Sequence, residues 1–151
     1  RHGRKLAERG EYLVSIMDCI ICHTPKKMTE QGPVPDMDRY MMGFDSSLRL
    51  PPIPDNLPLG PWMLFSSDLT AFIGPWPPLF WQYSPTWNRK RKLDLGPIFQ
   101  GPSEWYKGLD NSLTIVTPMP IAAYKNLTDK GVEVIFTCLI TVKPVDNVVP
   151  V

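Results

Sequence analysis

The sequence predicts a mainly α-helical domain with a long irregular excursion in its middle. Amphipathic helix patterns run over residues 4–19 and 126–145, where apolar residues recur every three or four positions. Between them, residues 51–120 carry thirteen of the 18 prolines, and proline removes the backbone donors on which strands depend. A chain of 151 residues suits one domain. We therefore expect residues 1–151 to form a single domain with an irregular Pro- and Trp-rich insertion at about 51–112.

The first helix contains a residue that helices do not favour. Its apolar stripe consists of Leu6, Gly10, Leu13, Val14 and Met17. Gly10 costs the helix about 1 kcal/mol relative to alanine, which predicts that another backbone passes close to this position. We expect the helix to give way near the cysteines, because Pro25 prevents a simple continuation.

The closing helix carries recognisable start and stop signals. Thr128 is the expected N-cap, and Asp129 suits the positive end of the helix dipole. Pro144 ends the element, because proline cannot continue the hydrogen-bond ladder. The face expected to lie in the core consists of Val132, Ile135, Phe136 and Leu139.

Charge and hydropathy argue against a nucleic-acid partner and against a transmembrane segment. The chain has 16 Lys and Arg against 15 Asp and Glu, so its bulk composition predicts no nucleic-acid partner. No apolar run approaches the roughly 18 residues of a membrane span. The longest run, over 132–142, is interrupted by Glu133 and Thr137, and we therefore expect no transmembrane segment.

The segment DCIICHTP, residues 18–25, gathers two of the three cysteines and one of the two histidines. A chance Cys-x-x-Cys-His is expected on the order of once in a thousand such chains. Covalent haem attachment explains every position of the motif. Each thiol adds across a vinyl group, the two-residue spacer matches the vinyl separation, and His23 lies beneath the iron as proximal ligand.

Three other interpretations of the motif explain less of it. A redox dithiol needs a βαβ context with its first cysteine at a helix N-terminus, whereas a helix precedes this motif. Zinc needs four ligands, and only His2 and Cys138 remain, far apart in the sequence. A disulfide across a two-residue spacer is strained. The motif therefore favours one haem c, bound covalently through Cys19 and Cys22, and we expect Cys138 to be a buried residue without a redox role.

Two stretches of the chain, residues 9–43 and 113–150, carry a family resemblance. RGEYLVSIMDCIICHTPKKM with GPVPDMDRYMMG, and PMPIAAYKNLTDKGVEVIFTCLITVKPVDNVVP, resemble the opening and closing segments of bacterial single-haem cytochromes c of the class I type. The resemblance implies a mainly α, class I cytochrome c-like fold around one haem. It also implies that the terminal helices cross at a close contact between a glycine and an aromatic residue, with Gly10 and Tyr12 on one helix and Phe136 on the other.

Met119 is the candidate for the second axial ligand of the iron. It stands between Pro118 and Pro120, whose fixed φ angles stiffen the loop around the soft thioether. The resemblance places the ligand methionine of the family at the same position. Core packing is the other interpretation of Met119, and His2 is the alternative ligand. Histidine and methionine together fill both axial positions and raise the reduction potential, which indicates outer-sphere transfer of one electron.

Further candidates are expected around the haem. A ligating histidine normally donates its other ring N–H to an acceptor, and the resemblance implies the backbone of a turn proline, for which Pro33 is the first choice and Pro35 the second. Haem propionates are usually met by Trp, Tyr or Arg donors. Trp62, Trp76 and Arg39 are the candidates for that role.

We therefore interpret the chain as an electron carrier rather than an enzyme, either free or a subunit of a membrane-bound respiratory or photosynthetic redox complex. The resemblance implies a periplasmic or extracytoplasmic location, because covalent haem attachment in bacteria follows export. The charged run NRKRKLD, residues 88–94, is either a solvated loop or a docking patch for an acidic redox partner. Two alternatives stay open: a haem-based sensor or enzyme subunit with an open iron position, and a haem-free interaction module held by a disulfide or metal.

Overall fold

A computed structural model describes residues 2–58, 62–74, 81–84, 124 and 126–150. The chain groups into two compact units. The first unit combines Arg1–Met17 with Arg91–Val142, and the second combines Asp18–Lys90 with Lys143–Val151. No helix within the described ranges is long and apolar enough to span a membrane.

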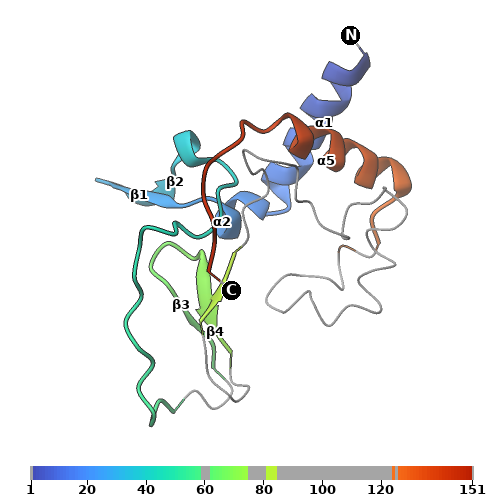
Figure 1. The fold of residues 1–151 in the computed structure, drawn as a ribbon. Coiled ribbons are helices and arrows are strands. Elements are labelled where there is room, and N and C mark those ends of the chain that lie inside the picture. The colour runs from blue at the N-terminus through green and yellow to red at the C-terminus, as the bar shows by residue number, and fades with distance from the viewer. Residues whose placement is uncertain (1, 59–61, 75–80, 85–123, 125, 151) are drawn as a thin grey trace. The chain divides into compact units, whose positions relative to one another are not determined.

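The first unit is built on the packing of helix α1 (His2–Ile16) against helix α5 (Asp129–Thr141), as Figure 1 shows. Gly10 is buried at the crossing, where an alanine Cβ would lie 1.8 Å from the Val134 carbonyl oxygen. The predicted close passage of another backbone is therefore confirmed.

The partner predicted for Gly10 is wrong. The atoms nearest to an added Cβ belong to Val134 and Cys138, not to Phe136, which is only half-buried. Tyr12 is 52% exposed, and the Arg9 guanidinium carbon lies 4.9 Å from the centre of its ring. The contact is thus formed by Gly10 against the backbone of Val134 and the small side chain of Cys138 on α5.

Helix α5 begins at its predicted N-cap and ends shortly before the predicted stop at Pro144. The Gly131 amide donates to Thr128 Oγ1 at 3.0 Å, so the N-cap prediction is confirmed. The helix ends at Thr141, earlier than predicted, and Val142 is already extended. The residue before Pro144 is also biased away from the helical conformation, which explains why the last turn does not continue to the proline. The buried face consists of Val132, Val134, Ile135, Cys138 and Leu139.

Helix α1 ends at Ile16, so the expectation that it gives way near the cysteines is confirmed, although the apolar pattern ran on to residue 19. Asp18 adopts a left-handed conformation with φ 61°, which short polar side chains tolerate better than most others. Within the first unit, the Tyr124 hydroxyl donates to the Met17 carbonyl oxygen at 2.8 Å and satisfies a carbonyl at the end of the helix. A second, short helix, α2 (Cys19–His23), follows after Asp18.

The second unit contains a two-stranded hairpin after α2. Strand β1 (Lys26–Thr29) pairs antiparallel with β2 (Gly32–Pro35), with Lys26 opposite Pro35. Gly32 closes the turn with φ 107°, a conformation that favours glycine. The 3-10 helix η1 (Met37–Arg39) follows, and the Asp36 carboxylate accepts a hydrogen bond from the Asp38 amide at its start.

A small sheet lies in the region expected to be mostly loop. Its antiparallel strands, in spatial order, are β3 (Leu64–Phe65), β4 (Ala71–Ile73) and β5 (Gln82–Tyr83). The buried side chains of Phe44, Ala71 and Val149 form a core beside it. The described part of this region therefore contains short strands that its prolines flank rather than interrupt. The sequence also allows a short helix near residues 103–109, a prediction that lies outside the described residues.

Candidate functional site

Helix α2 carries all three residues of the predicted haem-attachment motif. Cys19 and Cys22 are half-buried and His23 is buried. Because residues three apart lie on the same side of an α-helix, the two thiols are presented together on one turn. Cys19, Cys22 and Cys138 form no disulfide. The motif is thus a pair of thiols on one helical face with an imidazole directly after the second thiol.

A helix of five residues is too short to be stable alone, and neighbouring groups hold its C-terminal end. The Thr24 amide donates to the Ile20 carbonyl at 3.1 Å. The Lys26 ammonium donates to the carbonyl oxygens of Ile21 and, at 2.6 Å, of Thr24. A cation at a helix C-terminus also interacts favourably with the helix dipole. The local structure of the motif therefore depends on a lysine that follows it.

The residues directly after the motif are held by hydrogen bonds to residues 36–43. The Gly43 amide donates to the His23 carbonyl at 2.8 Å, and the Met41 amide donates to Thr24 Oγ1 at 3.0 Å. The Asp36 amide donates to the Pro25 carbonyl at 2.8 Å. Because Thr24 is fully buried, its hydroxyl serves as an internal hydrogen-bonding group of the fold. The backbone around His23 is thus fixed from a second segment of the same unit.

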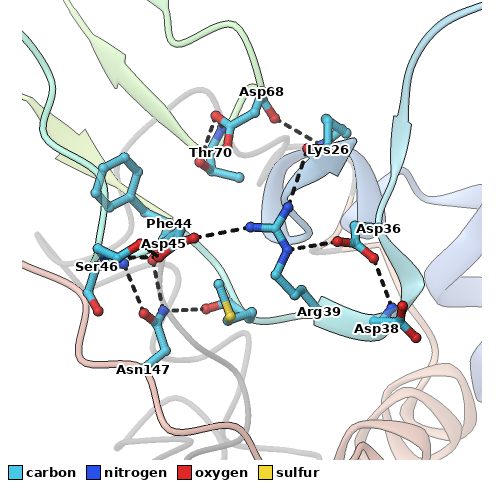
Figure 2. Close-up of polar contacts among 12 residues, drawn as sticks. Lys26, Asp36, Asp38, Arg39, Phe44, Asp45, Ser46, Asp68, Thr70 and Asn147 are labelled. Atoms are coloured by element: carbon cyan, nitrogen blue, oxygen red, sulfur yellow. Dashed lines mark hydrogen bonds and ion pairs between the residues drawn. The ribbon is translucent and has the colours of Figure 1, made fainter. Parts of the chain in front are cut away.

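That second segment is itself held by Asn147, a buried residue that sequence reasoning missed (Figure 2). The side-chain nitrogen of Asn147 donates to the carbonyl oxygens of Met42 and Phe44, at 3.0 and 2.8 Å. Its side-chain oxygen accepts from the Ser46 amide at 2.9 Å. A single asparagine near the end of a chain belongs to no recognisable motif, so the sequence offers no signal for this role.

Arg39, the predicted propionate donor, lies in an ion-pair network (Figure 2). Its Nε lies 2.8 Å from Asp36 Oδ2 and its Nη1 lies 3.1 Å from Asp45 Oδ2. Its Nη2 also donates to the Lys26 carbonyl at 3.4 Å. These contacts engage three of the five guanidinium N–H groups, which leaves two for any further acceptor.

The carboxylates of this network have pKa values below their ordinary range. For Asp36, the main cause of the lowered pKa is the hydrogen bond from Arg39. For Asp45, burial alone would raise the pKa, but hydrogen bonds from Ser47 and the nearby Arg39 charge together lower it. Both carboxylates are therefore charged at neutral pH, and the network contributes to stability above the acidic range and less as pH falls.

The electrostatics at Cys22 do not favour a thiolate at that position. Burial raises the pKa of the Cys22 thiol, and Lys26 opposes this shift only in part. A redox dithiol activates its first cysteine at a helix N-terminus, and Cys19 is the first residue of α2. The element before the motif is helix α1 rather than a strand, so the βαβ context of such a dithiol is not met. Burial likewise raises the pKa of Cys138 to about 11. Cys138 is therefore buried as predicted, and it remains a thiol throughout the physiological range.

The remaining predicted residues lie in other elements than α2 or outside the described residues. Pro33 and Pro35 lie in β2, where they pair with Met28 and Lys26. Trp62 is 69% exposed. Met119 and Trp76 lie outside the described residues, as does the charged run at 88–94.

The donor set of α2 fits a covalently bound haem. Attachment requires two thiols on one side of a short element and a histidine next to the second of them, and α2 supplies this arrangement in Cys19, Cys22 and His23. Among the residues that the structure describes, no group of three or more His, Cys, Asp or Glu side chains forms a metal site of its own.

The site is interpreted from its own residues. Cys19 and Cys22 supply the thiols and His23 supplies the imidazole, while Lys26 and residues 36–43 hold the backbone that carries them. Comparisons of the chain with family models, with curated proteins and with solved structures found no match.

Proposed function

We propose that the chain is an electron-transfer protein that carries one covalently bound haem c in a class I cytochrome c-like, mainly α domain. The observation that carries the proposal is the arrangement of Cys19, Cys22 and His23 on α2, with both thiols on one turn and outside any disulfide. The close packing of α1 against α5 at Gly10 adds support, since the terminal helices of the resembling family also cross at a glycine, although the partner there is aromatic and here is Val134 with Cys138.

In this proposal the residues of the chain bind and orient, and none acts as acid, base or nucleophile in a reaction on a substrate. The two cysteines would hold the haem through thioethers, His23 and Met119 would bind its iron, and the bound haem would supply reversible one-electron transfer. The candidates for contacts to the propionates are Arg39, Trp62 and Trp76, and the candidates for the His23 acceptor are Pro33 and Pro35.

The proposed setting is the periplasm or another compartment outside the cytoplasm. The partners are redox proteins, and a membrane-bound respiratory or photosynthetic complex would hold the chain as a subunit or exchange electrons with it. The charged run at 88–94 would dock against an acidic surface, since opposite charges steer association.

The test of haem attachment replaces both motif cysteines. Cells that attach c-type haem are expected to yield wild-type chain whose mass exceeds that of its residues by one haem, even after denaturation. The double variant Cys19→Ala/Cys22→Ala is expected to lose this added mass completely, because no thioether forms. Cys138→Ala is the matched control and is expected to keep it, since Cys138 lies on α5.

Intact mass and the visible spectrum distinguish the proposal from its alternatives. A wild-type chain without added mass contradicts haem attachment and favours the haem-free interaction module. High-spin iron with rapid ligand binding favours a sensor or enzyme subunit with an open position. A sulfur-to-iron charge-transfer band in the oxidised protein supports the electron carrier.

The second axial ligand is tested at Met119. Met119→Ala is expected to keep the covalent haem but to lower the reduction potential and open one coordination position, because the thioether favours the reduced iron. The measurements are intact mass, potentiometric titration and binding of an external ligand. Met28→Ala is the control, because Met28 is 78% exposed in β1. A spectrum unchanged by Met119→Ala would exclude Met119 as the ligand.

A further inference from the structure

We propose that Lys26 is a positioning residue for the haem-attachment helix, which its ammonium ties to the turn between β3 and β4. The inference rests on the proposed function and extends it to a residue outside the CxxCH motif. Lys26 Nζ donates to the carbonyl oxygens of Ile21 and Thr24 at the end of α2, and to the Asp68 carbonyl at 3.0 Å. Figure 2 shows the bond from Lys26 to Asp68.

The turn that receives Lys26 is rigid, which makes it a suitable anchor. The Asp68 carboxylate accepts hydrogen bonds from Ser66 Oγ at 2.7 Å, from the Thr70 amide at 3.1 Å and from Thr70 Oγ1 at 2.8 Å. Thr70 is fully buried. Because three donors fix the side chain of Asp68 and burial fixes Thr70, the Asp68 carbonyl is presented in one place.

The backbone of Lys26 is also fixed, so that its ammonium has little freedom. Lys26 lies in β1 opposite Pro35, and its carbonyl accepts from Arg39. Burial lowers the pKa of Lys26, while Asp68 and Cys22 oppose this shift. A partly buried cation that donates to three carbonyl groups forms charge-assisted hydrogen bonds, which are stronger than neutral ones. The contacts therefore hold the last turn of α2, with Cys22 and His23 on it.

The position of the charge has a consequence for electron transfer. Lys26 stands three residues after His23, and a cation held near a redox centre favours the state with the additional electron. The neighbouring Lys27 carries the same charge on an exposed side chain, where water and salt screen it. Substitutions of the two lysines thus separate an effect of the Lys26 hydrogen bonds from an effect of net charge.

The experiment compares the full-length variants Lys26→Met, Lys26→Arg and Lys27→Met. Lys26→Met is expected to speed hydrogen exchange of the Thr24 amide about tenfold, since charged hydrogen bonds to the end of α2 are lost. It is also expected to lower the fraction of chain with covalent haem and the reduction potential of the haem-loaded protein. Lys26→Arg keeps the charge and the donors and is expected to restore the exchange rate, the fraction with covalent haem and the reduction potential. Lys27→Met is expected to change none of these three quantities.

The results separate failure of this inference from failure of the proposed function. Lys26 is not a positioning residue if the Thr24 amide of Lys26→Met exchanges like the wild type, or if Lys27→Met has equal effects. If the reduction potential of Lys26→Met equals that of the wild type, Lys26 is also not a positioning residue, because a merely structural contact would leave the potential unchanged. Wild-type chain without covalent haem contradicts the proposed function instead, and the exchange rates still report whether Lys26 holds α2.

Discussion

Replacement of Gly10 by alanine is expected to lower the free energy of unfolding of the first unit by about 2 kcal/mol. The added Cβ would lie 1.8 Å from the Val134 carbonyl oxygen and 2.7 Å from the Cys138 Cβ. Since one obstacle is backbone, a rotamer change cannot relieve the overlap, and α1 and α5 must move apart. Overpacking of this kind costs up to about 3 kcal/mol, and the higher helix propensity of alanine returns about 1 kcal/mol.

The matched control is Gly3→Ala in the same helix. An added Cβ at Gly3 meets no heavy atom within 4 Å, so the substitution is expected to leave stability unchanged or to increase it slightly. Urea denaturation followed by hydrogen exchange at α1 and α5 amides measures both variants. Equal stabilities of Gly10→Ala and Gly3→Ala would contradict the close approach of the two helices.

The two long helices were predictable because each repeats one physical signal over several turns. Apolar spacing identified both, and Thr128 marked the start of α5. The unfavourable Gly10 even indicated the close passage of another backbone. Its partner was not predictable, because the crossing angle decides which residues of α5 meet the glycine, and this angle depends on the whole interface.

The shorter elements carried too little signal to predict. Strands β3 and β5 have two residues each, and alternation over two residues cannot be distinguished from chance. The region where α1 ends was expected, but the residue at which it ends depends on the left-handed conformation of Asp18, which aspartate tolerates but does not require. Tertiary contacts, rather than local preference, settle the structure at these positions.

The candidate site also has a part that the sequence predicts and a part that it does not. The thiols and the imidazole of α2 belong to a motif of fixed residue types at fixed spacing. Such a motif can be recognised in a single sequence. The groups that hold the motif are mainly backbone amides of Met41, Gly43 and Asp36, and backbone amides are present in every segment. Asn147 acts through contacts distant in sequence, and Lys26 joins two neighbouring carbonyl groups to the distant Asp68 carbonyl. One chain gives no pattern for such distant contacts.

Asn147→Asp is expected to destabilise the second unit by about 3 kcal/mol at neutral pH. The Asn147 side chain is 4% exposed and donates to the carbonyl oxygens of Met42 and Phe44. A carboxylate has no donor, so the part-buried Met42 carbonyl and the buried Phe44 carbonyl both lose the Asn147 donor and face a negative charge. Each unsatisfied buried group costs about 1–3 kcal/mol, and Asn147→Ala is therefore expected to be destabilising as well.

The pH dependence of the stability of Asn147→Asp distinguishes the effect of the lost donors and the buried charge from the effect of a changed side-chain shape. Burial disfavours the charged form of the introduced carboxyl, so its pKa in the folded state is expected above the value in the unfolded chain. The variant should therefore lose stability relative to Asn147→Ala as pH rises from about 4 through that raised pKa. Urea denaturation at several pH values measures the difference, and Asp146→Asn, at an exposed neighbour, is the control. If Asn147→Asp matches the wild type at neutral pH, Asn147 does not hold residues 42–46, and the segment that fixes the backbone of His23 must be stabilised from elsewhere.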